Sequence, residues 1–222
     1  MSIPGNTSQS LGPWMLTSSI AGHVAEPGLL AQHQWLANVP VPGTVAQALR
    51  AAGTWNLQTP RDFDAEDWWY RCNFTHAEVA GTRYILRLQG LATLAQVWLN
   101  GQPLLTSENM FHAHALDVTA QLRAHNELVI VFRALHPALA QRRPRPRWKT
   151  KLVSHQQLRW LRTTLLGRIP GWSPPVAPVG PWRAITLERR DETALAEVEL
   201  YPYLAGDLRV LEFRAMYPAQ RE

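Results

Sequence analysis

The sequence predicts an all-β protein, an antiparallel sandwich of the jelly-roll type with about eight strands in two sheets. Its apolar residues gather in short runs separated by turn residues, and only one segment near the start has a clear helical pattern. The clearest turn is Asn100-Gly101, which lies between two β-like runs. Asn-Gly is typical of a type I′ hairpin because both turn residues need a positive φ. The 222 residues are enough for one large β domain, or for one domain and a fragment.

The expected elements follow one another with a single helix near the start. Residues 35–45 form an extended piece that is too rich in proline for the middle of a sheet. The helix covers Val45 to Ala52, with Gly53 in the usual C-cap position. Strands are predicted at residues 67–74, 83–88, 94–99, 103–106, 113–118 (a strand or a turn), 126–133 and 182–188.

A long Pro/Arg-rich loop is expected between Ala134 and Pro181, where the strand pattern fails and eight prolines occur. Residues 154–165 have the pattern of a helical turn within it. A loop of this length is uncommon unless it is functional or covered by another part of the protein.

The positive charge of the chain is concentrated in the same region. The net charge is +5, and the stretch from Glu127 to Glu188 has no acidic residue between its ends but holds eleven of the 22 Lys and Arg residues. A basic run with an aromatic residue can bind nucleic acid, or it can be a solvated loop or dock on an acidic partner domain. The chain has no helix-turn-helix, zinc-ligand or RNA-binding signature, so we expect no nucleic-acid partner.

A charged break at residues 188–192 divides the chain. We place the sandwich domain at residues 1–190 and a second unit at residues 191–222, with strands at 194–203 and 207–216. Two strands cannot bury a core alone. The tail must therefore pack on the main domain, pair with a second copy in an oligomer, or begin a larger domain.

The single cysteine, Cys72, excludes an internal disulfide framework. Residues 1–12 have neither a basic n-region nor an apolar h-region, and no apolar run reaches the roughly 18 residues of a membrane span. We therefore expect a cytoplasmic protein with no membrane partner.

Six short motifs occur in order between Val39 and Glu188. They are Val41-Pro-Gly-Thr-Val45, Asp67-Trp-Trp-Tyr70, Gly90-Leu-Ala-Thr93 with Val97-Trp-Leu-Asn-Gly101, Asn109-Met-Phe111 with Asp117-Val-Thr119, Asn126-x-Leu-x-Ile-x-Phe132, and Gly180-Pro-Trp-Arg183 with Ile185-x-Leu187. Together they resemble the N-terminal sugar-binding domain of glycoside hydrolase family 2, and its β-mannosidase-like members in particular.

The resemblance implies a galactose-binding-like jelly-roll β-sandwich. In complete members of that family this domain precedes an immunoglobulin-like domain and a (β/α)₈ barrel, whose two glutamates work in the retaining arrangement. The implied role of residues 1–190 is to bind carbohydrate and form one wall of the active site, without catalytic residues, metal or cofactor. Residues 191–222 would be the first strands of a truncated immunoglobulin-like domain, and the missing domains would hydrolyse the glycosidic bonds.

The resemblance also points to the long loop as the sugar-binding element. Mannosidase-like members usually carry a Gly-Trp-Asp-Trp-Gly-Pro type of segment there, whereas this chain has Gly171-Trp-Ser-Pro-Pro175. Trp172 is the implied candidate for stacking on a pyranose, with interdomain packing as the alternative. Ser173 is a candidate too, but it cannot supply a carboxylate, so mannose specificity does not follow from the resemblance.

Two other residues are candidates for polar contacts with a sugar. Arg159 could recognise hydroxyl groups as a bidentate donor, or it could anchor the loop on the missing domains. Asn109 could contact sugar at the face of the barrel, or it could lock its loop with Phe111 in the core.

Two clusters could carry chemistry but are not assigned any. His112 and His114 lie on one strand face without a third ligand at a matching spacing, so no metal site is predicted. Paired carboxylates can act on glycosides, but an acidic run is usually a solvated loop, and we expect this of the run Asp62, Asp64, Glu66 and Asp67.

Two functions stay open at this point. An accessory domain of a glycoside hydrolase would have an incomplete tail, a flat apolar docking patch and negligible affinity for sugar on its own. A free-standing carbohydrate-binding or interaction module would have a self-contained fold with measurable binding.

Overall fold

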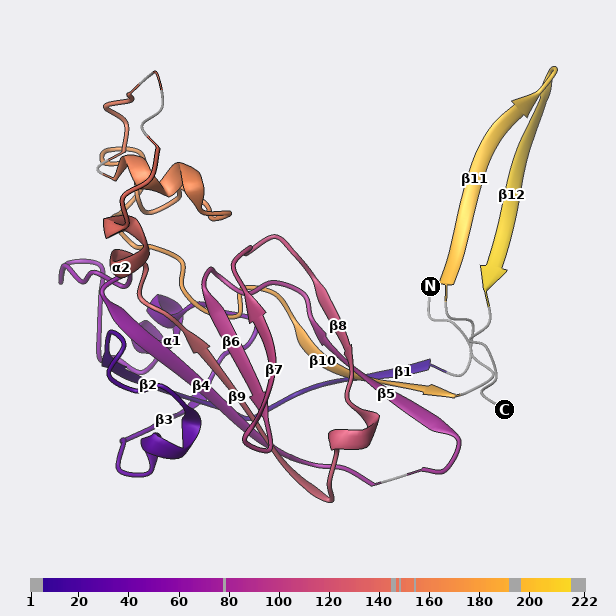
Figure 1. The fold of residues 1–222 in the computed structure, drawn as a ribbon, viewed down its shortest axis with the longest axis horizontal. Helices are drawn as coiled ribbons and strands as arrows, with labels where there is room; N and C mark the ends of the chain where they lie inside the picture. Colours follow the sequence, from indigo (N-terminus) through magenta and orange to yellow (C-terminus); the bar gives the residue numbers. More distant parts are fainter. Residues whose placement is uncertain are drawn as a thin grey trace.

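Two antiparallel sheets form the body of the protein in the computed structural model, which describes residues 6–77, 79–144, 147, 149–153, 155–191 and 197–216. The larger sheet has the order β3-β2-β4-β9-β6-β7 and the smaller has the order β1-β10-β5-β8. The larger sheet consists of β2 (Trp14–Ile20), β3 (Leu36–Val39), β4 (Glu66–Thr75), β6 (Ala95–Leu99), β7 (Gln102–Ser107) and β9 (His125–Phe132). The smaller consists of β1 (Asn6–Ser10), β5 (Thr82–Leu88), β8 (His114–Asp117) and β10 (Ile185–Asp191). The predicted all-β sandwich is confirmed (Figure 1).

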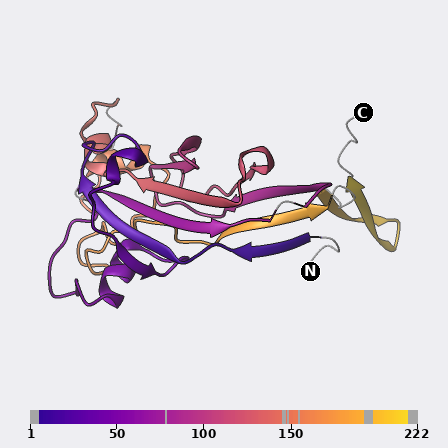
Figure 2. The ribbon, with the colours of Figure 1, turned by 90° about the horizontal axis from the view of Figure 1, so that it is seen from below.

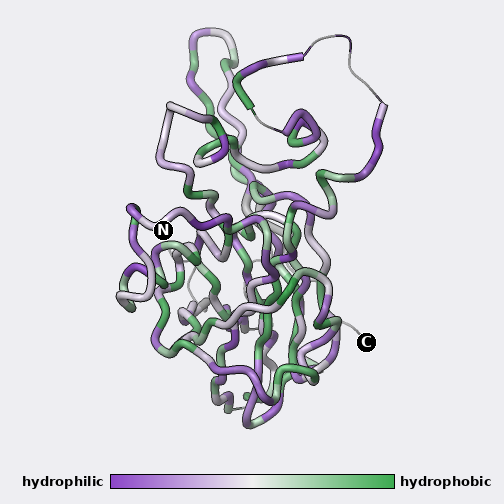
Figure 3. The backbone as a smooth tube through the Cα atoms, turned by 90° about the vertical axis from the view of Figure 1, so that its left-hand side faces the viewer, coloured by the Kyte–Doolittle hydropathy of each residue, from purple (hydrophilic) through white to green (hydrophobic). Residues whose placement is uncertain are grey.

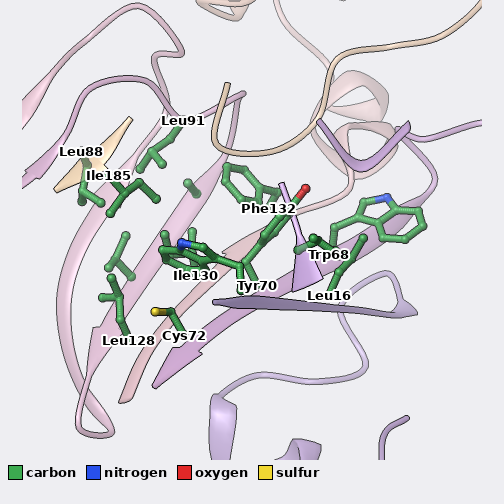
Figure 4. Packing of buried hydrophobic residues seen from close by; sticks show 14 of the residues in the cluster. Leu16, Trp68, Tyr70, Cys72, Leu88, Leu91, Leu128, Ile130, Phe132 and Ile185 are labelled. Atoms are coloured by element: carbon green, nitrogen blue, oxygen red, sulfur yellow. The ribbon is translucent and has the colours of Figure 1, made fainter. Parts of the chain in front are cut away.

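The core lies between the two sheets, where inward-facing side chains alternate along the central strands (Figure 4). The labelled side chains come from both sheets: Leu16, Trp68, Tyr70, Cys72, Leu128, Ile130 and Phe132 from the larger, and Leu88 and Ile185 from the smaller. Burial raises the pKa of the Cys72 thiol to about 12. The only cysteine is therefore a protonated core residue at neutral pH.

A second apolar layer covers the outer face of the larger sheet. Trp69 of β4 stacks on Trp98 of β6 with ring centroids 5.9 Å apart, and Val24 and Leu30 pack against them. The central strands β4 and β9 are thus buried on both faces. This explains why the predicted strand at 126–133 contains a continuous apolar run, residues 128–132, rather than an alternating pattern.

The two local signals that were clearest in the sequence are confirmed. Asn100 and Gly101 have φ values of 53° and 78° and join β6 to β7. Helix α1 (Val45–Ala51) begins after Thr44, whose side chain accepts a hydrogen bond from the Gln47 N–H, and Gly53 follows it with a φ of 70°. Figure 3 shows that hydrophilic and hydrophobic residues are interspersed along the chain.

The sequence missed the first two strands. β1 is a wholly polar edge strand that is held by main-chain pairing with β10, so it has no hydrophobic pattern to find. β10 also begins at Ile185 and not at residue 182. The indole of Trp182 turns aside to donate a hydrogen bond to the carbonyl of Met110 at 2.8 Å.

The long loop is more structured than its prolines suggest. It contains a second helix, α2 (Leu135–Ala140), and the 3₁₀-helix η3 (Gln156–Trp160), which lies within the segment expected to form a helical turn. Leu135, Leu139 and Leu158 pack together as a small separate core. Further 3₁₀ turns are η1 (Pro27–Leu30) and η2 (Thr119–Gln121). Residue 154 and part of the basic run, at residues 145, 146 and 148, lie outside the described residues.

The strands β11 (Glu197–Ala205) and β12 (Leu208–Met216) form a separate two-stranded sheet around Gly206-Asp207. Figures 1 and 2 show this hairpin beyond the ends of the sandwich strands. The first residues of the predicted strand at 194–203 lie outside the described part of the chain. Within the described residues no helix is long and apolar enough to cross a membrane.

Candidate functional site

The candidate sugar-binding residues lie on the long loop and its neighbours, at the end of the sandwich that carries α1 and α2 (Figure 1). Two clefts open there. One, which we call the α1 cleft, has a volume of about 620 Å³ and is lined mostly by apolar residues of α1, Trp55, Leu57 and the loop. The other, the α2 cleft, has a volume of about 660 Å³ and is lined by residues 60–64, α2, η3 and the loop. Gly167 and Ser173 line both clefts, so the segment between them forms the ridge that separates the two.

This ridge, residues 167–173, is a compact turn that we call the Trp172 turn. The Oγ of Ser173 accepts a hydrogen bond from the Gly167 N–H at 2.9 Å and closes the turn. Gly167 and Gly171 have φ values of 76° and 80°, a region that favours glycine. The side chain of Trp172 is left 79% exposed. Ser173 therefore shapes the turn, and Trp172 presents a large apolar surface to the outside.

A buried ion pair anchors the Trp172 turn to the sandwich. The guanidinium of Arg168 donates two hydrogen bonds, both 2.7 Å long, to the two carboxylate oxygens of Asp64, and the side chains are only 5% and 9% exposed. Arg168 also donates to the carbonyl of Thr164 at 2.9 Å. Asp64 lies just before β4, so this pair joins the loop to the entrance of a central strand.

The expectation that the acidic run is a solvated loop is wrong for two of its members. Asp64 and Asp67 are 7% and 1% exposed. Asp67 accepts hydrogen bonds from the Arg133 guanidinium and the Ala134 N–H, both at 2.8 Å. Buried carboxylates need such partners because desolvation of an unpaired charge is costly. Asp62 stays on the surface and Glu66 pairs with Arg61.

Asn109 lies beside the long loop, and its side chain is used in a hydrogen bond within its own loop. Its Oδ1 accepts a hydrogen bond from the Phe111 N–H at 3.0 Å, and its main chain bridges to Arg162. Phe111 is 56% exposed, whereas Met110 is buried, so the residue of this triplet that enters the interior is Met110. The Met110 Sδ accepts from the Thr164 N–H at 3.1 Å.

Arg159 is bound within η3 and its flank. Its guanidinium donates to the carbonyl of Gln156 at 2.8 Å and to the Gln156 side chain at 2.6 Å. Gln156 in turn donates to the carbonyl of Thr150. These contacts brace the segment before η3.

The four predicted residues are therefore brought together only in part. Trp172 and Ser173 share one turn, and Arg168, Thr164 and Met110 couple that turn to the loop of Asn109. Arg159 belongs to a different hydrogen-bonded unit. Sequence reasoning missed the Asp64–Arg168 pair, since no local pattern links residues that are 104 positions apart.

The two histidines after β7 form a pair. The rings of His112 and His114 are 4.5 Å apart, and His114 Nε2 lies 3.0 Å from the Oγ of Ser107. Burial, together with the nearby His112, lowers the pKa of His114. Among the residues that the structure describes, no three His, Cys, Asp or Glu side chains are grouped so as to hold a metal ion.

Comparison with known proteins agrees with this architecture. The family described as "Glycosyl hydrolase 2 galactose-binding domain-like" matches residues 14–183. The chain is 31% identical to a β-mannosidase B of Aspergillus niger over 183 residues, which are 72% of this chain and 20% of the relative. It is 34% identical to a β-mannosidase B of Thermothelomyces thermophilus over 133 residues, 54% of this chain and 15% of the relative.

Solved structures show the same fold. A β-D-mannosidase from Dictyoglomus thermophilum superposes with a TM-score of 0.68 at 20% identity, over 95% of this chain and 26% of the other. A β-glucuronidase from Faecalibacterium prausnitzii gives 0.60 at 18% identity, over 97% and 36%. The chain thus spans no more than about a fifth of the curated relatives just named. It belongs to the glycoside hydrolase family 2 galactose-binding-like domains, and its sandwich is the N-terminal domain fold of that family.

Proposed function

We propose that this chain is the sugar-binding domain of a retaining glycoside hydrolase that acts on β-mannosides, and that it forms one wall of the active site without doing chemistry itself. The observation that carries the proposal is the exposure of Trp172 on a turn that a buried ion pair holds in place. A tryptophan left 79% exposed on a fixed turn offers a flat apolar face on which a sugar ring can pack.

The rigidity of the turn supports a binding role. The Ser173 Oγ closes the turn, and the two Arg168–Asp64 hydrogen bonds fix it to the sandwich. A preorganised aromatic side chain loses little conformational entropy when it stacks on a ligand. The two curated relatives compared above are both named β-mannosidase B, and this supports β-mannosides as the substrate class.

A domain exchange tests the proposal. Residues 1–222 replace the matching segment of the Aspergillus niger β-mannosidase B, and hydrolysis of 4-nitrophenyl β-D-mannopyranoside is measured. We expect Trp172→Ala to lower kcat/KM of the chimaera by about tenfold, or ~1.4 kcal/mol of transition-state binding, because the stacking surface is lost. The matched control is Trp160→Ala, which removes another exposed tryptophan of the long loop, in η3.

Equal activity of the Trp172→Ala and unsubstituted chimaeras would contradict this role for Trp172. The isolated chain should hydrolyse nothing and bind sugars no more tightly than millimolar, since it supplies only one wall. Micromolar affinity in calorimetric titration with β-linked manno-oligosaccharides would instead identify a free-standing carbohydrate-binding module.

We propose further that residues 191–222 begin an immunoglobulin-like domain that continues along the polypeptide. One face of the β11–β12 hairpin is mostly apolar: Leu200 pairs with Phe213 and Pro202 with Leu211, and Leu204 follows on the same side, where it pairs with Arg209. The leucine and phenylalanine side chains of this face are 57–72% exposed. A two-stranded hairpin with such a face needs a further layer to cover it.

The change Leu211→Ser tests this assignment. In the 222-residue chain we expect the urea midpoint of unfolding to stay unchanged, because Leu211 is 63% exposed. In a polypeptide extended through the next domain of a relative, the same change should destabilise that domain by about 2–3 kcal/mol, the cost of losing one buried leucine. No destabilisation in the extended protein would mean that another surface covers this face. We also propose a cytoplasmic location, which the single cysteine supports because it fits a reducing compartment.

A further inference from the structure

The floor of the α2 cleft is formed by buried side chains, which are either apolar or already paired with each other. Phe63, Leu139 and Leu158 in its lining are 1%, 7% and 4% exposed. The Arg168 and Asp64 side chains also line it, and they neutralise each other through two hydrogen bonds. The floor is therefore a rigid support that offers no free charge to a ligand.

The rim of the same cleft carries accessible polar groups. The carboxylate Oδ2 of Asp62 lies 3.0 Å from the Nε2 of His136, and these side chains are 56% and 44% exposed. The ring of His155 follows at a centroid distance of 6.0 Å from His136. Asp62 Oδ1 accepts a hydrogen bond from the Asp64 N–H at 3.0 Å, which fixes the direction of the carboxylate. Each carboxylate oxygen keeps a lone pair for a further donor.

The Trp172 turn forms another part of the lining. Ile169, Pro170, Gly171 and Ser173 line the cleft on this side. Their mostly apolar surface faces the same space as the carboxylate and imidazole groups. An apolar wall with a few converging polar groups is the usual composition of a small-molecule site.

We propose that the α2 cleft is a subsite for a neutral pyranose, in which Asp62 accepts hydrogen bonds from sugar hydroxyls and His136 completes the contact. The inference rests on the proposed function and deepens it, because it names polar recognition residues beside the Trp172 turn. A carboxylate can accept two neighbouring hydroxyl groups at once, and hydrogen bonds to a charged acceptor are the stronger ones. The volume of about 660 Å³ is within the range of ligand pockets.

The charges around the cleft favour a neutral sugar over a uronic acid. Arg168 is paired with Asp64, and Arg61 donates two hydrogen bonds to Glu66. Of the carboxylates in the described lining, Asp62 is the one that no guanidinium pairs with, and its partner is the ring of His136. A sugar carboxylate placed here would meet a like charge.

Nuclear magnetic resonance titration of the 222-residue chain tests the subsite, because it detects weak binding residue by residue. Methyl β-D-mannopyranoside should shift the amide signals of cleft residues such as Leu139 and Gly171. Asp62→Asn should weaken its binding by about tenfold, the effect of losing a hydrogen bond to a charged acceptor. The matched control is Asp207→Asn at the exposed tip of the β11–β12 hairpin, which removes the same charge far from the cleft and should leave binding unchanged.

Three results would overturn the subsite: no shifts in the cleft at saturating sugar, equal affinity of the Asp62→Asn and unsubstituted chains, or tighter binding of methyl β-D-glucuronide than of the mannoside. An unchanged thermal midpoint of Asp62→Asn excludes loss of fold as the reason for weaker binding. The chimaera with Trp172→Ala separates the two proposals. If it loses activity while Asp62→Asn binds normally, the active-site wall stands and the α2 subsite fails.

Discussion

Arg168→Met should lower the free energy of unfolding of this chain by about 3–5 kcal/mol, because it leaves the carboxylate of Asp64 buried without its counter-charge. Asp64 is 7% exposed and receives two hydrogen bonds, each 2.7 Å long, from the guanidinium of Arg168. Methionine fills a similar volume but donates no hydrogen bond. Urea denaturation followed by tryptophan fluorescence measures the loss.

Arg83→Met is the matched control. Arg83 donates to Asp117 at 2.7 Å, the same distance as in the buried pair, but the two side chains are 49% and 42% exposed. Solvent screens such a pair, so we expect a loss of less than about 1 kcal/mol. Equal losses in the free energy of unfolding for Arg168→Met and Arg83→Met would show that burial does not determine how much the Asp64–Arg168 pair contributes to stability.

The double change Asp64→Leu with Arg168→Met separates charge from packing. If the penalty of the single change comes from an uncompensated charge, the apolar pair should recover most of the lost stability. Recovery of stability without recovery of sugar binding would show that the pair is kept for the position of the Trp172 turn and not for stability alone. That outcome would tie the ion pair directly to function.

The strands that sequence reasoning found are those whose burial pattern is local. Residues 128–132 are all apolar because β9 is covered on both faces, and β4 carries its tryptophans for the same reason. The Asn100-Gly101 turn and the capped helix α1 were equally readable, since their signals lie within a few residues. These features were enough to predict the sandwich.

The features that were missed depend on partners far along the chain. β1 has five polar residues and is a strand because the main chain of β10 offers it hydrogen bonds. Helix α2 includes Pro137 and forms because Leu135 and Leu139 meet Leu158 of η3. No local propensity indicates either contact.

The candidate site divides in the same way. Trp172 and Ser173 were named as sugar-binding candidates through the resemblance to a family segment, whereas the exposure of Trp172 and the turn that Ser173 closes are seen only in the structure. The prediction for the acidic run was wrong for Asp64 because its partner, Arg168, lies 104 residues away in the sequence. Local sequence does not distinguish a carboxylate that is buried against a distant arginine from a solvated one. Asp62 is exposed, as expected for the acidic run, but only the structure shows that it lines the α2 cleft.

Gly167→Ala should have the second large effect, because the Trp172 turn has no room for a side chain at this position. A Cβ on residue 167 would lie 2.0 Å from the carbonyl oxygen of Val176, which is main chain and cannot rotate away. The φ of 76° at Gly167 adds the strain of a left-handed conformation. Together we expect a cost of about 2–5 kcal/mol, from overpacking and backbone strain.

Gly171→Ala in the same turn is its control. Gly171 has a similar φ of 80°, but nothing lies within 4 Å of the place that a Cβ would occupy, so only the backbone strain of about 1–2 kcal/mol applies. The difference between the two variants therefore isolates the contact with Val176. In the chimaera, Gly167→Ala should also lower kcat/KM about as much as Trp172→Ala does, because a turn that opens no longer holds the indole in place. If Gly167→Ala destabilised the chain but left kcat/KM of the chimaera unchanged, Trp172 would not need the rigid turn in order to act. The proposed dependence of the active-site wall on this turn would then be wrong, although the assignment of the fold would stand.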